Sequence, residues 1–443
     1  MTTQLSRTLS ARDLIVITVG TVIGSGVFLT PGLVMRNAGS VGMAMAIWVT
    51  GGVLSMMGAL TYAELGCMRV GAGGLYAYIR DAFGRATAFT YGWTLLLVIA
   101  SGSVATLAVA AGDNLAAVTP LGDFGKKGVA FAIIGAVAAL NVRGTRESTR
   151  VLGVATALKV LALAVLIVVL PVVGHGFAEV TTVWPTSVDG SVLSGGLVAL
   201  VSVLWAYEGW QYATFMGGEV IDPQRNFPRG LVIGTLCIAV IYIFVNVGYL
   251  AALGPVRLAS STAAASESVG AVFGPVSARL IAIPVLVSII SALHGILLTS
   301  ARVIHAMSRD GLFFAKLGEV HPKFGTPANG VIALAAWSAV LAMSGTFEML
   351  LTYVVFVGWF FYGLGGASVI VFRRREPDAP RPMRVPGYPV TPILFVLSAM
   401  VIVVNTIVDN PMRGLIGVLA TLSALPVYLY WRRAASRAAS RAA

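Results

Sequence analysis

Long runs of apolar residues, separated by short polar stretches, follow one another along the whole chain. A run of roughly 17 to 25 apolar residues is long enough to cross about 30 Å of hydrocarbon as an α-helix. The pattern predicts twelve such helices, of which the ninth is short. Their expected ranges are 13–36, 41–66, 87–112, 127–142, 151–173, 192–217, 229–253, 277–303, 328–344, 348–372, 391–409 and 413–431.

The composition agrees with a polytopic membrane protein. Of the 443 residues, 57% are hydrophobic and only 11% are charged, and the mean hydropathy is +0.88. This leaves too little polar surface to cover a water-soluble body of that size. The polar residues 1–12 lead into a full-length span without a small-residue cleavage site, so the first helix is expected to act as its own insertion signal.

The net charge of +12 is distributed unevenly over the loops that these spans define. One side receives 23 of the 30 Lys and Arg residues. The other side receives Lys126, Lys127, Arg257 and Arg413, while Arg36 and Arg279 lie near helix ends on that side and Lys159 lies within a span. By the positive-inside rule, this bias places both termini in the cytoplasm and the chain in the cell (inner) membrane. Topology therefore explains the basicity, and no nucleic-acid partner is needed.

The first span contains a stretch that is poorly suited to a continuous helix. Residues 20–31 read GTVIGSGVFLTP, with three glycines, a serine and a closing proline. Unpaired backbone groups cost several kcal/mol each in lipid, so an interrupted helix persists only where it lines a protein or water cavity. Glycine also lets a ligand approach the backbone. Gly24 and Gly26 therefore indicate either a binding site or close packing between helices.

A second interruption, five helices later, favours a binding site. The centre of the sixth span reads WAYEGWQ, which places Glu208, Gly209 and Gln211 among three aromatic residues. A carboxylate at mid-membrane costs about 2.5 to 3.5 kcal/mol and is a functional candidate by default. Interrupted segments at corresponding positions of two halves point to an inverted-repeat transporter. The expected parts are a 1–12 segment, repeats at 13–190 and 191–372, a basic loop at 373–390, two helices within 391–431 and a tail at 432–443.

Several motifs carry a resemblance to a known family. They are GTVIGSGVFLTPG in the first span, YAELG at 62–66 with GGLYAYIRDAFG after it, WAYEGWQ, NFPRG at 226–230, and SARVIHAMSRDGLF followed by HPKFGTP. In this order, over about residues 10–385, the chain resembles the amino acid-polyamine-organocation (APC) superfamily, and within it the L-type amino acid transporter branch and its bacterial relatives. The resemblance implies an all-α membrane protein with about twelve transmembrane helices, in which a five-plus-five inverted repeat (LeuT-like fold) with broken helices 1 and 6 is followed by two further helices.

The resemblance also implies a substrate site at the two breaks. Backbone amides around Ser25 and Gly26 would hold the carboxylate of an amino acid, in agreement with the preference of helix N-termini for anions. Freed carbonyls would hold its ammonium group, and Trp205 would be an aromatic gate. The substrate-binding residues predicted in this way are Val22, Ile23, Gly24, Ser25, Gly26, Ser103, Trp205, Ala206, Glu208, Gly209 and Gln211.

Lys159 is the only basic residue deep in an apolar span, eight residues after Val151. From that depth a snorkelling side chain would reach either interface with difficulty. In the resembling transporters, a lysine at this place in helix 5 stands where sodium-coupled relatives bind sodium. We therefore expect transport to be independent of sodium, with Lys159 and Glu208 as the candidate coupling residues.

The sequence leaves the substrate open. A neutral or broad L-amino acid exchanger or facilitator, working by alternating access, is the leading expectation. Many neutral-amino-acid carriers of the family have glycine where this chain has Glu208, so a proton-coupled or cationic amino acid or polyamine transporter is the alternative. A membrane enzyme would need an acid-base or metal constellation that the sequence lacks, and a channel would need a symmetric pore ring.

No disulfide-linked heavy subunit, cofactor or metal is predicted. The cysteines Cys67 and Cys237 have neither disulfide nor metal spacing. Relatives that are linked by a disulfide to a glycoprotein carry a cysteine in the outer loop between helices 3 and 4. That loop reads VTPLGDFGKKG here, so no disulfide-linked heavy subunit is expected.

Overall fold

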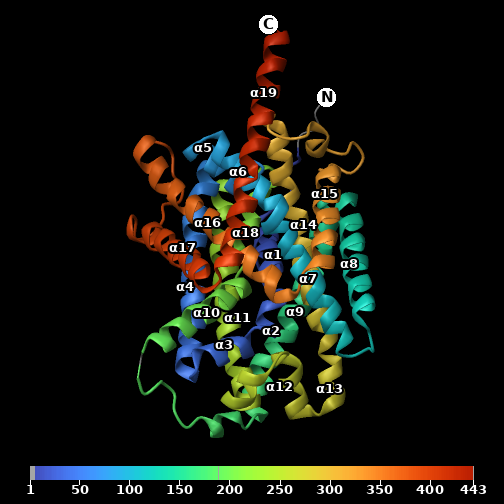
Figure 1. Cartoon of the computed structure of the whole chain (residues 1–443), viewed down its shortest axis with the longest axis vertical. Helices are drawn as coiled ribbons and strands as arrows, with labels where there is room; N and C mark the ends of the chain where they lie inside the picture. Colours follow the sequence, from blue (N-terminus) through green and yellow to red (C-terminus); the bar gives the residue numbers. More distant parts are fainter. Residues whose placement is uncertain (1–4, 188, 443) are drawn as a thin grey trace.

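The computed structural model describes residues 5–187 and 189–442 and is almost entirely helical (Figure 1). Helices account for 81% of the residues. Within the described ranges there is no β-strand, only one isolated bridge between Leu9 and Val220. Among the described residues, eleven helical segments are long and apolar enough to span a membrane, and the shorter apolar helix Ala328–Ser344 coincides with the ninth predicted span. The chain is a multi-pass membrane protein, as predicted.

The helices agree closely with the predicted spans. The first five spans are α1 (Ala11–Val22) with α2 (Gly26–Leu29) and α3 (Pro31–Ala38), then α4 (Val41–Met68), then α6 (Arg85–Thr94) with the π-helix η1 (Leu95–Ile99) and α7 (Ala100–Ala116), then α8 (Asp123–Arg143) and α9 (Thr145–Val173). The next five are α10 (Gly190–Ala206) with the 3₁₀ helix η3 (Trp210–Glu219), α11 (Pro223–Ser260), α13 (Pro275–Leu280) with α14 (Ala282–Arg309), α15 (Ala328–Ser344) and α16 (Phe347–Arg375). The last two are α17 (Val390–Asp409), and α18 (Pro411–Leu422) with α19 (Ala424–Ala442).

Short helices connect some of the spans. They are α5 (Leu75–Phe83), η2 (Gly176–Glu179), α12 (Ala264–Phe273) and η4 (Ala315–Gly318). The predicted seventh span ended at residue 253, and the backbone leaves the helical conformation at Gly254, with φ of +68°. The end of this span was therefore predicted correctly although α11 continues beyond it.

Both predicted interruptions are present. The first span stops at Val22 and resumes at Gly26, and Thr30 joins α2 to α3 in the helical region. The sixth span stops at Ala206 and resumes as a 3₁₀ helix. Gly209 between the two parts has φ of +129°, which a residue with a side chain rarely adopts. A ten-residue 3₁₀ helix is unusually long, and such stretches often mark functional hinges.

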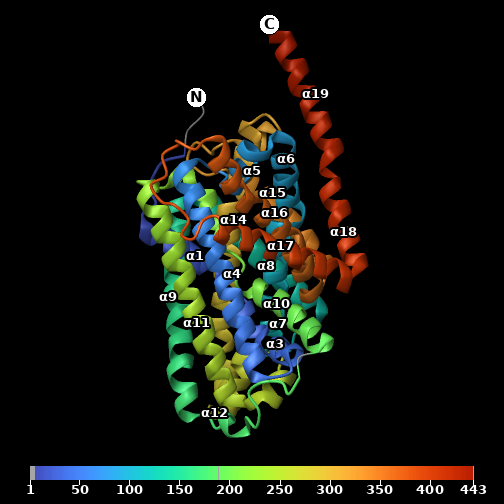
Figure 2. The same ribbon diagram turned by 90° about the vertical axis from the view of Figure 1, so that its left-hand side faces the viewer.

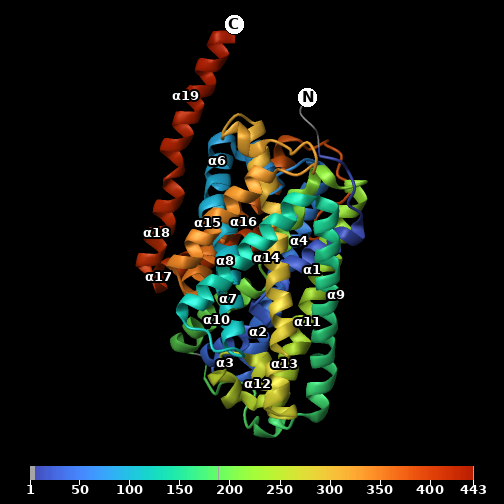
Figure 3. The ribbon, with the colours of Figure 1, turned by 90° about the vertical axis from the view of Figure 1, so that its right-hand side faces the viewer.

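The described ends of the chain lie on one side of the bundle. Residue 5 and the far end of α19 are on the same side, and α19 extends beyond the other helices (Figures 1, 2 and 3). We call this the termini side. The opposite side, which we call the far side, carries α3, α12 and α13 (Figure 3).

Ion pairs tie the helices together on the termini side. Arg302 on α14 is fully buried, and its Nε donates to Glu219 at the end of η3 at 2.8 Å and its Nη2 to Thr145 at the start of α9 at 2.7 Å. The main-chain carbonyl of Glu219 also accepts from the amides of Thr8 and Leu9 at 2.8 and 2.9 Å. The segment before α1 is thereby bound to the second half of the broken sixth span.

Two further networks close this side. Glu64 on α4 receives a bidentate hydrogen bond from Arg373, at 2.8 and 2.7 Å, and one from the amide of Val385 at 2.7 Å. Asp310 accepts from Arg80 at 2.8 Å and from the Tyr76 hydroxyl at 2.9 Å. Burial, followed by the Asp310 charge, raises the pKa of the Tyr76 phenol above its ordinary value, so the phenol remains a donor.

Candidate functional site

The two helix breaks lie against each other at the centre of the bundle. A Cβ atom added to Gly26 would lie 2.5 Å from the Cα atom of Ala206, and one added to Gly209 would lie 3.0 Å from the main chain of Thr21. The Thr21 hydroxyl lies 3.0 Å from the carbonyl oxygen of Gly209. The glycines of the two predicted motifs therefore permit contact between the two backbones. They allow close packing and also leave main-chain groups exposed.

A small cavity lies where the breaks meet, and we call it the central cavity. Its volume is about 10 Å³, enough for about one water molecule. Seven of the predicted residues line it: Val22, Gly24, Ser25, Gly26, Ser103, Trp205 and Glu208. Thr21, Leu107 and Ile296 line it as well. Ile23, Ala206, Gly209 and Gln211 belong to the surrounding shell and do not line the cavity.

The amides of the first break are available for a ligand. The main-chain N–H groups of Gly24, Ser25 and Gly26 donate to no backbone carbonyl in the described part of the chain. The Ser25 side chain is buried, and its hydroxyl also has no partner there. Buried donors are almost always paired in folded proteins. Three adjacent amides at the start of a helix are a suitable cradle for a carboxylate.

The carbonyl groups of the breaks are mostly occupied. The Ile23 carbonyl accepts from Lys159 at 2.5 Å and from Ser288 at 3.0 Å, which uses both of its lone pairs. The Tyr242 hydroxyl lies 3.1 Å from the Val22 carbonyl and 3.0 Å from the Ala206 carbonyl, so its single proton serves one or the other. A substrate ammonium group bound here would replace one of these donors.

Lys159 reaches from α9 into the first break and is only 1% exposed. Its ammonium nitrogen lies 2.7 Å from the Gly20 carbonyl and 2.6 Å from the Ser291 hydroxyl, in addition to Ile23. All three of its protons are therefore used. Lys159 links α9, α1 and α14 without lining the central cavity, so it lies behind the site.

Glu208 is held by two side chains that face it from different helices. Its Oε1 atom accepts from Gln211 at 2.6 Å and from the hydroxyl of Tyr362 on α16. Gln211 also donates to the Tyr362 oxygen at 2.8 Å. Glu208 is buried and also touches the central cavity, so its side chain meets both a neighbouring helix and the cavity.

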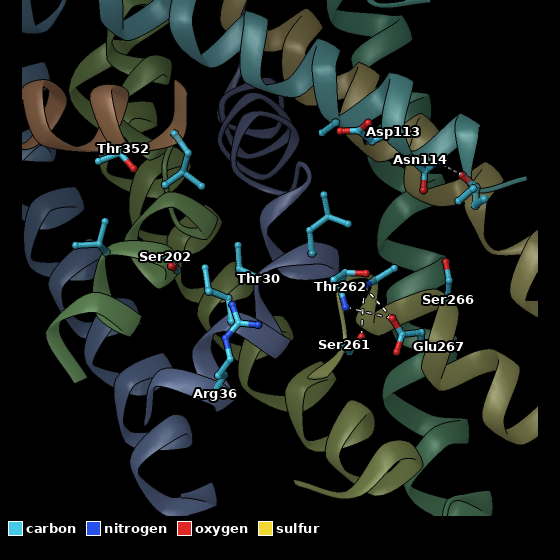
Figure 4. Close-up of a pocket in the computed structure, with 18 of the residues that line it drawn as sticks. Thr30, Arg36, Asp113, Asn114, Ser202, Ser261, Thr262, Ser266, Glu267 and Thr352 are labelled. Carbon is cyan, nitrogen blue, oxygen red and sulfur yellow. Dashed lines mark hydrogen bonds between the residues drawn. The ribbon is translucent and has the colours of Figure 1, made fainter. Parts of the chain in front are cut away.

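A second and much larger cavity, which we call the far-side cavity, is lined by residues of α3, α12 and α13 among others (Figure 4). The far-side cavity measures about 830 Å³ and is lined by Thr30 on the first span, Ala110 on α7 and Ser202 on α10. These positions are three or four residues from Gly26, Leu107 and Trp205, which line the central cavity. One helical turn, about 5 Å, therefore separates the two cavities on three elements, and Trp205 lies at the central-cavity end of that turn on α10.

Sequence reasoning missed several residues that complete the site. Tyr242, Ser288 and Tyr362 bind the breaks or Glu208 from neighbouring helices, and Ser291 accepts from the Lys159 ammonium group. A hydroxyl in an apolar span gives little indication of which carbonyl or carboxylate it will meet. The spacing of Ser288 and Ser291 on one helical face was the only signal available.

The comparisons with known proteins agree with this geometry. The amino acid permease family model matches residues 9–425. The chain belongs to the amino acid permease family. This match confirms the resemblance to the APC superfamily and covers both broken segments.

Individual relatives carry names that agree with the family. The permease is 32% identical to the large neutral amino acids transporter small subunit 2 of Oryctolagus cuniculus, over 94% of its own length and 79% of the relative. It is 31% identical to the b(0,+)-type amino acid transporter 1 of Mus musculus, over 93% and 84% of the two chains. It is 30% identical to the serine/threonine exchanger SteT of Bacillus subtilis, over 93% of each chain.

The contact between Gly26 and Ala206 gives a testable consequence for the permease. We expect Gly26→Ala to lower thermal stability in detergent, by the equivalent of about 1–3 kcal/mol, and to weaken amino acid binding at least tenfold, because the new methyl group separates the two breaks. A leucine at this position would overlap the Ala206 main chain, so alanine is the more informative change. Gly135→Ala is the matched control, because nothing lies within 4 Å of its added Cβ. Equal affinity and melting temperature in Gly26→Ala and wild type would contradict this packing.

Proposed function

We propose that this permease is a sodium-independent secondary transporter that carries neutral or broadly chosen L-amino acids by alternating access, as an exchanger or facilitator. The observation that carries the proposal is the set of amides at Gly24, Ser25 and Gly26, which have no main-chain acceptor among the described residues and line a cavity where two helix breaks meet. This cradle recognises the carboxylate that all amino acids share. The names of the relatives, two transporters and an exchanger, support the same substrate class.

The cavities support alternating access with the far side as the open one. The far-side cavity reaches to Ser202, one helical turn from Trp205, whereas Arg302, Glu219 and the segment before α1 close the termini side. A central cavity of about 10 Å³ is too small for an amino acid, so binding requires the breaks to move apart. We further propose that both termini are cytoplasmic, from the charge bias, and that residues 13–190 and 191–372 form the inverted repeats.

Lys159 supports independence from sodium. Its ammonium group has two main-chain carbonyls and one hydroxyl as partners, all within 2.7 Å. Oxygen ligands of this kind would coordinate a monovalent cation, and the ammonium already supplies the positive charge. A sodium ion at the same place would meet charge repulsion as well as occupied ligands.

Glu208 supports the alternative function, proton-coupled or cationic amino acid transport. Its carboxylate touches the central cavity and is within reach of a second ammonium group on a substrate. Tyr362 and Gln211 already donate to it, however, which reduces its capacity to bind a cation. We favour neutral substrates for this reason.

We propose that the permease functions without a disulfide-linked heavy subunit. The segment between α7 and α8 contains no cysteine, and of the two cysteines Cys67 is buried and Cys237 lies within the α11 span. Membrane-enzyme chemistry is not part of the proposal, because the relatives are named as transporters.

The defining experiment is uptake of labelled alanine, serine or leucine into proteoliposomes that hold the purified permease. An exchanger requires unlabelled amino acid inside, whereas a facilitator fills empty vesicles. The methyl ester of the transported amino acid should inhibit uptake at least tenfold less well than the free acid, because it lacks the carboxylate that the amides bind. The proposal fails if folded, reconstituted protein moves none of these amino acids above empty liposomes.

Replacing sodium with choline should leave uptake unchanged, and Lys159→Ala should reduce it at least tenfold. Loss of the ammonium group leaves the Gly20 and Ile23 carbonyls without their donor and removes the link between α9 and α1. Lys316→Ala, which changes an exposed lysine, is the matched control. Uptake by the wild type that depends on sodium would refute the assignment.

Glu208→Gln separates the two candidate functions, because it keeps the shape of the side chain and removes its charge. If Glu208 binds cationic substrates, arginine and lysine uptake should fall at least tenfold while alanine uptake is maintained. If it carries a proton, the pH dependence of uptake should flatten for every substrate. Glu319→Gln serves as an exposed control. An unaltered substrate ranking together with an unaltered pH profile would exclude both roles.

A further inference from the structure

The walls of the far-side cavity carry a particular set of charges. Three arginines line it, Arg36, Arg279 and Arg413, together with two carboxylates, Asp113 and Glu267. Figure 4 shows Arg36 on one side of the cavity and Asp113 and Glu267 on the other. These residues come from α3, α13, α18, α7 and α12, so the charges are contributed by five helices around the far-side cavity.

Both carboxylates are occupied by groups of the protein. Asp113 forms an ion pair with Lys126 at 3.1 Å. Glu267 accepts hydrogen bonds from the main-chain amides of Thr262 and Ala263, each at 3.2 Å (Figure 4). The two negative charges are therefore engaged, one by a cation and one by the start of a helix.

Within the described part of the chain, the three arginines have fewer charged partners than the two carboxylates have hydrogen-bond donors. Arg413 donates at 3.1 Å to the neutral hydroxyl of Thr352, and among the described residues it forms no ion pair with a carboxylate. Arg36 and Arg279 are exposed, and neither forms an ion pair with a carboxylate in the described part of the chain. The described residues that line the cavity carry three positive charges and two negative ones, a net charge of +1, and Lys126 adds a further positive charge beside Asp113.

This concentration of positive charge is unusual for the far side. Only six basic residues belong to that side, because most Lys and Arg residues lie on the termini side. Three of the six line the cavity, and a fourth pairs with one of its carboxylates. The positive-inside rule accounts for the scarcity of basic residues here but not for their gathering around one opening.

A positive field across an entrance acts on the charge of whatever passes through it. Clefts lined by charges of one sign change the local concentration of charged ligands, and low-dielectric walls strengthen the effect. An amino acid with a neutral side chain is a zwitterion and feels little net force. A cationic side chain adds a charge that the field repels, whereas an anionic side chain adds one that it attracts.

We propose that the far-side cavity is an electrostatic filter, in which Arg36 and Arg279 discriminate against amino acids with cationic side chains and favour neutral and acidic ones. The inference rests on the proposed transport function and deepens it by naming the substrate class that the entrance admits. The filter acts through the field of the arginines on a charged side chain, from entry until binding, and not through the contacts that Glu208 makes in the central cavity.

The test compares three inhibitors of similar size and different charge. Glutamine, glutamate and lysine are each titrated against uptake of a labelled neutral amino acid from the far side of proteoliposomes at low ionic strength. In the double variant Arg36→Gln, Arg279→Gln, the lysine-to-glutamine ratio of inhibition constants should fall about fivefold and the glutamate-to-glutamine ratio should rise by a similar factor. Raising the salt to about 0.5 M should shrink both changes, because the charges are exposed.

Arg257→Gln is the matched control. Arg257 is an exposed arginine on the same side that does not line the cavity, so both ratios should remain at their wild-type values. Absence of uptake by the wild type would contradict the transport function itself. Normal uptake with the same ratios in wild type, double variant and control would refute the filter alone, and equal changes in the control would show that general surface charge, not the cavity, is responsible.

Discussion

The structure depends on how interrupted backbone is satisfied inside a membrane. Each break frees N–H and C=O groups that lipid cannot pair, so both breaks must be supplied with partners by neighbouring helices. The protein meets this requirement by placing the breaks together and surrounding them with donors. Lys159, Ser288 and Tyr242 donate hydrogen bonds to the carbonyl groups of the breaks. The Thr21 hydroxyl joins the first break to the second. Helices α9, α11 and α14 are thereby fixed around one centre.

Neighbouring helices supply hydrogen-bond donors to the carbonyl groups of the breaks but, among the described residues, no main-chain acceptors to the amides of the first break. This difference determines which chemical group the site can bind. Donors from the protein saturate the Ile23 carbonyl and reach the Val22 and Ala206 carbonyls, whereas the amides of residues 24–26 receive no main-chain acceptor in the described part of the chain. A site left with unpaired amides selects an anionic group. The zwitterion of an amino acid fits this imbalance because its carboxylate supplies the acceptor that the first break lacks.

Much of the fold and part of the site could be predicted from the sequence, and the division has a physical cause. Apolar length and charge bias are local properties, so the spans were recovered to within a few residues, including the break at Gly24 and the end near Gly254. Lys159 and Glu208 stood out because a charge in an apolar span is costly. The partners Tyr242 and Tyr362 are inconspicuous hydroxyls whose roles depend on tertiary packing between distant segments. For the same reason, the sequence could not show that side chains of the protein already donate to the carbonyls that were expected to bind a substrate ammonium group.

The pairing of the segment before α1 with Glu219 has a practical consequence for observing the molecule. Thr8 and Leu9 are joined by main-chain hydrogen bonds to the end of η3, and Ile221 donates back to the Leu9 carbonyl at 2.8 Å. The segment therefore follows the broken helix when that helix shifts. A fluorophore or spin label attached at Ser6 would report this displacement from outside the membrane, without any probe atom near the central cavity.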